Sequence, residues 1–223
     1  MEKVTGIILM GGTGVRFGSD VPKQFHLLHG KKIYLHALEV FVNSHLFDSV
    51  ILVCHPDWIP LVEKETTQYH VKVIAGGRTR QESSYLGLLA CPQDTNYVVI
   101  HDALRPFVSQ KILQRNVEQV KIYQAIDTCI PSSDTLVHSK DGLMIDKIPL
   151  RKEYFRGQTP QSFSHSLILE AHKKTARTDV SDDCSLVLEL GHPITLALGE
   201  EKNMKITTEF DLLLASTTGL FQK

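Results

Sequence analysis

The sequence predicts a three-layer α/β domain with a mostly parallel sheet. Short apolar runs alternate with longer stretches of helical period, and this alternation is typical of βαβ units. The runs expected to form strands are 6–10, 50–54, 71–74 and 97–101. The stretches expected to form helices are 34–43, 60–68, 81–89 and 111–122, with Ser109 as the N-cap of the last.

The pattern changes between about residues 131 and 155. A polar segment at 134–138, a turn at 140–142 and a short segment at 143–145 indicate two antiparallel strands, which we expect to form a β-hairpin arm projecting from the main sheet. After the arm we expect helices at about 164–176 and 181–190, a strand at 194–198 and a helix from Glu209 onward. Because no repeat or linker divides the chain, residues 1–223 are predicted to form a single domain.

The composition limits the classes of partner. Lys and Arg number 24 against 25 Asp and Glu, so the formal net charge is −1. Neither nucleic acid nor a membrane is expected as a partner, and an anionic ligand must be held by a local cluster of cations. The four cysteines are widely spaced without a metal-binding pattern, and the first apolar run, ending at Met10, is too short for a signal sequence. These features favour a cytoplasmic location.

A glycine-rich loop follows the first predicted strand, and it comprises Gly11, Gly12, Thr13 and Gly14. Its backbone N–H groups can hold a phosphate chain. Phe17 stands where the dinucleotide fingerprint needs glycine, and no Lys-Ser/Thr pair completes a Walker A loop. Arg16 and Lys23 instead supply two cations for phosphate oxygens. This pairing favours a triphosphate ligand over a glycine turn with two solvated cations.

Six short motifs follow one another along the chain, at 11–17 with 22–25, 76–83, 101–106, 134–135, 159–161 and 203–207. Together they resemble the motifs of the sugar-phosphate nucleotidyltransferases, and more narrowly of the IspD-like cytidylyltransferases. The resemblance extends over nearly the whole chain. It implies a three-layer, Rossmann-like nucleotidyltransferase domain, and an enzyme that joins CTP to a polyol phosphate with Mg²⁺ or another divalent cation.

The resemblance also implies roles for individual residues. The catalytic cations on the phosphates are Arg16, Lys23 and Lys205, and the residues that contact the nucleotide besides the glycine-rich loop are Gly77, Arg78 and Ser83. Asp102, at the sheet edge where open α/β folds bind ligands, is implied to bind the metal and the acceptor. The resemblance implies that the acceptor is also contacted by Arg105, Thr135, Arg151, Thr159 and Thr207. In this family the arm of one subunit enters the partner's site, so a homodimer is implied.

Two acceptors stay open. Transfer to 2-C-methyl-D-erythritol 4-phosphate gives 4-diphosphocytidyl-2-C-methyl-D-erythritol, in isoprene biosynthesis, and transfer to D-ribitol 5-phosphate gives CDP-ribitol. Residues 80–83 and 181–183 look more like the methylerythritol branch, whereas 148–151 and 157–159 look as much like the ribitol branch. Leu150 replaces the commoner aspartate before Arg151. From these residues, methylerythritol phosphate is favoured.

Other interpretations fit less well. An NAD-dependent oxidoreductase needs the intact fingerprint and an acidic residue after the second strand, where this chain has His55. A non-catalytic nucleotide-binding protein would not need Arg16, Lys23, Asp102 and Lys205 together. The sequence Ser181-Asp182-Asp183 fits a helix N-cap better than a second metal site, and the spacing of the histidines predicts no zinc site.

Overall fold

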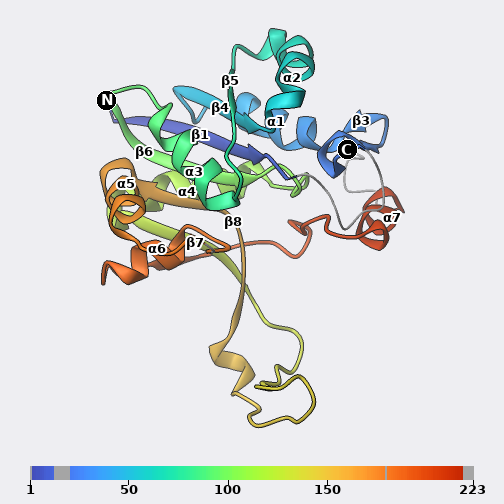
Figure 1. Cartoon of the computed structure of the whole chain (residues 1–223), viewed down its shortest axis with the longest axis vertical. Coiled ribbons are helices and arrows are strands. Elements are labelled where there is room, and N and C mark those ends of the chain that lie inside the picture. Colours follow the sequence, from blue (N-terminus) through green and yellow to red (C-terminus); the bar gives the residue numbers. More distant parts are fainter. Residues whose placement is uncertain (1, 13–20, 179, 218–223) are drawn as a thin grey trace.

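A computed structural model describes residues 2–12, 21–178 and 180–217, which fold around a seven-stranded sheet (Figure 1). In sheet order the strands are β5 (Lys72–Ala75), β4 (Ser49–Cys54), β1 (Lys3–Met10), β6 (Thr95–Asp102), β8 (Phe155–Ser164), β7 (Ala125–Pro131) and β9 (Thr195–Leu198). β8 is antiparallel to both of its neighbours, β6 and β7, and the other pairings in this sheet are parallel. The predicted mostly parallel α/β sheet is confirmed.

Helices cover both faces of the sheet, so the three-layer prediction is also confirmed (Figure 1). One face carries α1 (Ile33–Asn43), α2 (Ile59–Thr66) and α4 (Gln110–Tyr123), and the other carries α3 (Arg80–Leu89), α5 (His165–Lys174) and α6 (Cys184–Glu189). Phe41 on the first face and Phe163 on the second are fully buried. Burial of one such side chain stabilises the fold by about 1.5–3 kcal/mol.

The last helix, α7 (Glu209–Thr217), packs beside a small antiparallel pair, β2 (Leu27–Leu28) and β3 (Lys31–Lys32). Ala215 of α7 and Leu28 belong to one buried apolar cluster with Ile206, which fixes the segment before α7 against the body. No helix in the described ranges has both the length and the apolar character needed to cross a membrane.

Local side-chain hydrogen bonds begin two of the helices that border the sheet edge. The Thr79 hydroxyl accepts a hydrogen bond from the backbone N–H of Glu82 at 3.0 Å and caps α3. The Ser109 hydroxyl accepts one from the N–H of Ile112 at 3.2 Å, which confirms the predicted cap of α4. Each cap satisfies a donor that the first turn of a helix leaves unpaired.

Neither β7 nor β8 was predicted from the sequence. β8 is mostly polar, yet Thr159, Gln161 and Ser162 within it are buried. The Ser162 hydroxyl donates to Asn116 Oδ1 of α4 at 2.8 Å, so its partner comes from another part of the chain. A strand whose buried groups are polar and satisfied by distant residues has no apolar alternation to reveal it.

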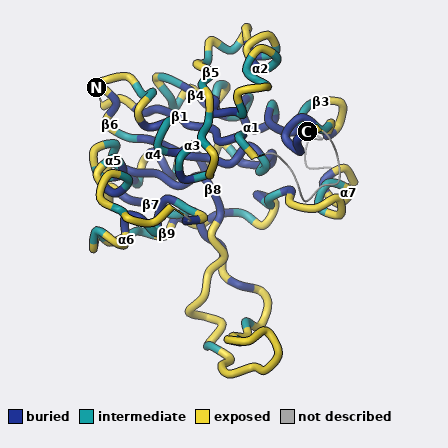
Figure 2. Tube along the Cα trace, viewed as in Figure 1, coloured by how far each residue is buried: buried dark blue, intermediate teal, exposed yellow. Residues whose placement is uncertain are grey.

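Residues 132–154 form the predicted arm, which extends away from the sheet and is exposed over most of its length (Figures 1 and 2). The prediction of two regular strands within it was wrong, because antiparallel pairing is limited to one bridge between His138 and Lys147. The predicted turn is present: Asp141 Oδ1 accepts from the N–H groups of Leu143 and Met144, both at 2.9 Å. An isolated two-stranded hairpin lacks a packed face, which explains the irregular backbone.

Candidate active site

A pocket of about 440 Å³ opens at the carboxyl ends of β1 and β6. Its wall combines residues of β1 and the loop after it, the 23–24 segment, the start of α3, the end of β6, and the 205–207 segment. The lining residues are Leu9, Met10, Gly11, Gly12, Lys23, Gln24, Gly77, Arg78, Thr79, Arg80, Ser83, Asp102, Leu104, Lys205 and Thr207. Ligands of open α/β sheets bind at this edge.

Two buried side chains shape the side of the pocket next to the glycine-rich loop. Gln24 donates from Nε2 to the backbone carbonyls of Met10 at 2.7 Å and Gly12 at 3.0 Å, so it holds the beginning of the loop. Lys23 is only 6% exposed, and its ammonium group donates to the backbone carbonyl of Thr207. A segment near the end of the chain therefore holds the Lys23 cation on the pocket wall.

The turn before α3 forms another part of the pocket wall. The Ser83 hydroxyl accepts from the N–H of Gly77 at 3.1 Å and donates to the carbonyl of Thr79 at 2.9 Å. A Cβ atom on Gly76 would lie 2.9 Å from the Ser83 oxygen, and one on Gly77 would lie 2.2 Å from Glu82 Cγ. Glycine is thus required at both positions for the turn to close onto α3.

Asp102, at the end of β6, is the acidic group of the pocket. Its Oδ2 accepts from Lys205 Nζ at 2.6 Å, and its Oδ1 accepts from Arg80 Nε at 3.3 Å. Burial alone would raise the pKa of Asp102, but Arg80 and Lys205 outweigh it and hold that pKa well below its usual range. Asp102 is consequently a carboxylate at neutral pH, between two cations on the pocket wall.

A short hydrogen-bond chain fixes the backbone at Asp102. The N–H of Asp102 donates to the Thr159 hydroxyl at 3.0 Å, and that hydroxyl is 3.0 Å from His101 Nδ1. His101 Nε2 lies 3.1 Å from the carbonyl oxygen of Arg105, which can only accept, so Nε2 carries the proton and Nδ1 accepts from Thr159. Thr159 therefore holds the backbone of Asp102 in place without lining the pocket itself.

Comparisons with known proteins identify the family of the chain. The family model described as 2-C-methyl-D-erythritol 4-phosphate cytidylyltransferase matches residues 4–218. The chain belongs to this cytidylyltransferase family. It is accordingly a CTP-dependent nucleotidyltransferase, as the motifs predicted.

Members of the family that resemble the chain carry two different acceptor names. It is 37% identical over 222 residues to a ribitol-5-phosphate cytidylyltransferase of Lactiplantibacillus plantarum, covering 94% of this chain and 95% of the relative. A 4-diphosphocytidyl-2C-methyl-D-erythritol synthase structure from Anaerococcus prevotii has a TM-score of 0.87 at 26% identity, and the match covers 100% of this chain and 99% of the other. A 2-C-methyl-D-erythritol 4-phosphate cytidylyltransferase structure from Thermus thermophilus has a TM-score of 0.79 at 29% sequence identity, and the match covers 94% of this chain and 96% of the other.

The pocket brings together most of the site residues that the family resemblance implied. They are Gly11, Gly12, Lys23, Gly77, Arg78, Ser83, Asp102, Lys205 and Thr207. The implied contacts Thr13, Gly14 and Arg16 lie outside the described residues.

Four implied acceptor residues do not line this pocket. Thr159 lies behind Asp102, and Arg105 donates to the carbonyl oxygens of Asn203 at 2.8 Å and Gly157 at 3.4 Å. Thr135 and Arg151 are on the exposed arm, where Arg151 donates to the Ser133 carbonyl at 3.0 Å. Their roles in the family's reaction stay predictions.

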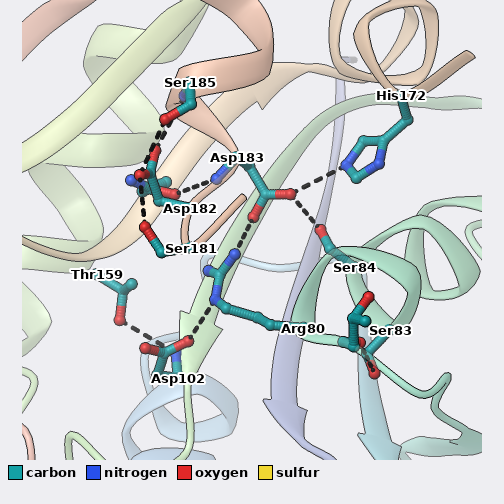
Figure 3. Close-up of polar contacts among 12 residues, drawn as sticks. Arg80, Ser83, Ser84, Asp102, Thr159, His172, Ser181, Asp182, Asp183 and Ser185 are labelled. Carbon is teal, nitrogen blue, oxygen red and sulfur yellow. Dashed lines mark hydrogen bonds and ion pairs between the residues drawn. The ribbon is translucent and has the colours of Figure 1, made fainter. Parts of the chain in front are cut away.

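Arg80 was not singled out from the sequence, and the segment Ser181-Asp182-Asp183 was predicted to be a helix N-cap. In the structure Asp183 occupies the N-cap position of α6 without a capping bond from its own side chain. The capping bond comes from Asp182, whose Oδ1 accepts from the N–H of Ser185 at 2.9 Å (Figure 3). Asp183 points inward and pairs with Arg80 at 2.8 Å, 103 residues away in the sequence. No local signal distinguishes the two adjacent aspartates.

Burial of His101 predicts a specific pH dependence of stability. Burial lowers the pKa of His101 from its ordinary value of 6.5 to about 4. As the pH falls below about 6.5, His101 of the unfolded chain takes up a proton before the buried His101 does, which favours unfolding. The contribution of neutral His101 to the free energy of unfolding is therefore complete above pH 6.5 and is lost toward pH 4. We expect the free energy of unfolding to drop by on the order of 2–3 kcal/mol over this range from His101 alone.

Urea unfolding of the wild type and His101→Gln at several pH values between 7.5 and 4.5 measures this effect. The variant is expected to be less stable at pH 7.5 and to lose less stability on acidification. His36, whose pKa is also lowered by burial, is present in both proteins and does not affect the difference. Parallel stability curves for the two proteins would rule out the assignment to His101.

Proposed function

We propose that this cytidylyltransferase joins CTP to D-ribitol 5-phosphate, giving CDP-ribitol and pyrophosphate. The observation that carries the proposal is the 37% identity to the ribitol-5-phosphate enzyme along 94% of the chain. The two solved structures described above, both named for methylerythritol compounds, are 26% and 29% identical. The segments 148–151 and 157–159 look as much like the ribitol branch as like the methylerythritol branch, so they are compatible with this choice.

The second candidate acceptor is 2-C-methyl-D-erythritol 4-phosphate, which the sequence motifs favoured. The matching family model and the two similar solved structures, which are named for methylerythritol compounds, support it. The two acceptors differ in their carbon chain and share a terminal phosphate, so the cations that neutralise phosphate do not distinguish them.

The chemistry needs no protein nucleophile. A phosphate oxygen of the acceptor attacks the α-phosphorus of CTP, a new P–O bond forms, and the bond between the α- and β-phosphates breaks to release pyrophosphate. Because both reactants are anions, the enzyme has to place them in line and neutralise the charge on the transferring group. We assign this neutralisation to Lys23, Lys205 and Arg16. The attacking phosphate is already ionised near pH 7, so no general base is required.

The pocket fits a divalent cation held by one carboxylate. Each oxygen of Asp102 has a described partner, and a carboxylate offers about four lone-pair positions, so positions for a cation are left. Mg²⁺ commonly takes one or two protein carboxylates and completes its shell with phosphate oxygens and water. We propose that Asp102 holds Mg²⁺ or another divalent cation, which when bound neutralises phosphate charge. Among the described residues, no group of three or more His, Cys, Asp or Glu side chains offers an alternative site.

Pyrophosphate release by the purified protein tests the acceptor. The protein is supplied with CTP and Mg²⁺ and either D-ribitol 5-phosphate or 2-C-methyl-D-erythritol 4-phosphate. We expect a higher kcat/KM for ribitol 5-phosphate by at least about tenfold, which corresponds to about 1.4 kcal/mol of discrimination in the transition state. A higher kcat/KM for methylerythritol phosphate would contradict this proposal and favour the second candidate.

We also propose a homodimer in which the arm covers the partner's pocket. Large apolar side chains on the arm are exposed to solvent, among them Leu143 at 86%, Met144 at 73% and Ile148 at 63%. Side chains of this kind gathered on one projecting segment are typical of an interface. Arg151, near the base of the arm, would then serve the acceptor phosphate in the other subunit.

Mixing two inactive variants tests this arrangement. Lys23→Ala removes a cation from the pocket, and Arg151→Ala removes one from the arm. If the arm serves the partner, each mixed dimer has one intact site, so random mixing restores about a quarter of wild-type activity. Sedimentation velocity of the wild type gives the oligomeric state independently. A monomer, or a mixture without activity whose subunits demonstrably exchange, would contradict the proposal.

A further inference from the structure

Arg80 joins two carboxylates that are 81 positions apart in the numbering, those of Asp102 and Asp183 (Figure 3). It is the first residue of α3, and its side chain lines the pocket. Its Nε donates to Asp102 at 3.3 Å, and its Nη1 donates to Asp183, just before α6, at 2.8 Å. The planar guanidinium can hold two acceptors in fixed relative directions, which an ammonium group cannot do.

Asp183 is a rigid anchor for Arg80. Its side chain is 1% exposed, and its Oδ1 accepts from the Ser84 hydroxyl at 2.6 Å and lies 3.0 Å from His172 Nε2. The backbone N–H of Asp183 donates to Gln161 Oε1 of β8 at 3.1 Å. Burial alone would raise the pKa of Asp183, but Arg80, His172 and Ser84 together lower it to about 2. α3, α5, β8 and the start of α6 therefore all hold one ionised carboxylate.

Stability alone gives little reason for such a pair. Removing two charges from water is costly, and well-packed apolar residues often replace a buried ion pair without loss of stability. What Arg80 adds is orientation: it contacts Asp102 on the oxygen opposite the one that Lys205 occupies. Without Arg80, the Asp102 side chain is held on one oxygen by Lys205, whose side chain is 37% exposed.

We propose that Arg80 is a positioning residue for the cytidylyl transfer, fixing the Asp102 carboxylate in the pocket while Asp183 anchors Arg80 from behind. The inference rests on the cytidylyltransferase activity and not on the choice of acceptor. Arg80 acts through Asp102, so its loss should lower kcat more than it weakens the binding of CTP.

The key experiment separates positioning from stability by comparing Arg80→Met with the double variant Arg80→Met/Asp183→Asn. The single variant leaves Asp183 buried and without its arginine, so its Tm should fall. The double variant removes both charges, so its Tm should recover toward the wild type. Positioning predicts that kcat stays about 10–100-fold low in both variants, because Asp102 is unclamped in both, while the Kd for CTP by calorimetry changes less than about threefold.

Arg80→Lys is the conservative variant, and Arg177→Gln is the matched control. Lysine keeps the charge but cannot bridge both carboxylates with fixed geometry, so kcat should stay low. Arg177 forms an ion pair with Glu189 at 3.1 Å away from the pocket, so its variant should keep wild-type kcat. Recovery of both Tm and kcat in the double variant would show that Arg80 is only structural. A loss confined to the Kd for CTP would make Arg80 a nucleotide ligand and also overturn the proposal.

A crystal structure of the double variant gives a readout that needs no turnover. We expect the main chain of β6 to superpose on the wild type and the Asp102 carboxylate to leave its position. An unmoved carboxylate would overturn the proposal. Failure of the wild type with both candidate acceptors would count against the proposed function alone, since this structural comparison would still decide the role of Arg80.

Discussion

Lys23→Ala is expected to lower kcat on the order of 10²-fold or more while the protein remains folded. Lys23 is 6% exposed on the pocket wall, in surroundings where a cation attracts an anion more strongly than it does in water. Its ammonium group already donates to the Thr207 carbonyl, so it is oriented before a nucleotide arrives. A cation fixed in advance stabilises charge that develops on the transferring phosphate without further reorganisation.

Pyrophosphate release at saturating CTP and acceptor measures the effect of Lys23→Ala, and circular dichroism with thermal unfolding tests whether the variant is folded. Lys3→Ala is the control, because Lys3 pairs with Asp94 at 2.5 Å on an exposed part of the sheet. The control should keep wild-type kcat. A folded Lys23→Ala protein with more than about a tenth of wild-type kcat would show that Lys23 does not carry the assigned share of the transition-state charge.

The sequence was most informative where burial is apolar. β1, β4 and β6 each contain a run of buried aliphatic residues, and their observed carboxyl ends lie within about one residue of the predicted ones, although β1 begins earlier than predicted, at Lys3. Ser109 capped its helix as predicted, because a cap depends on residues a few positions apart. β8 could not be predicted in this way, since buried Thr159 and Gln161 depend on partners from distant elements.

The same division applies to the site. The motifs named Lys23, Asp102 and Lys205 as site residues, and the structure places all three on the wall of one pocket, because each lies in or near an element at the ligand-binding edge. Arg80 and Asp183 were missed as a pair, because only the packing of α3 against α5 and the start of α6 brings them together. Of two adjacent aspartates, the sequence does not tell which accepts the capping hydrogen bond and which is buried against Arg80.

Asp102→Asn is expected to lower kcat/KM about 10²–10³-fold. Asparagine keeps the shape of the side chain, and the bond from the backbone N–H to Thr159 does not involve the carboxylate. What is lost is the negative charge between Arg80 and Lys205, and with it the ligand proposed for the divalent cation. Arg80 retains Asp183 as a partner, so the change should leave the fold intact.

The measurement pairs steady-state kinetics with calorimetric binding of CTP at increasing Mg²⁺. If Asp102 holds the cation, the variant should need more Mg²⁺ for the same CTP affinity, whereas Asp94→Asn, on the exposed surface, should match the wild type in both assays. A folded Asp102→Asn protein within about threefold of wild-type kcat/KM would contradict the role of this carboxylate. If Asp102→Asn loses turnover but its Mg²⁺ requirement is unchanged, Asp102 does not hold the cation. Its charge would then act only on Lys205 and the acceptor, which it would orient.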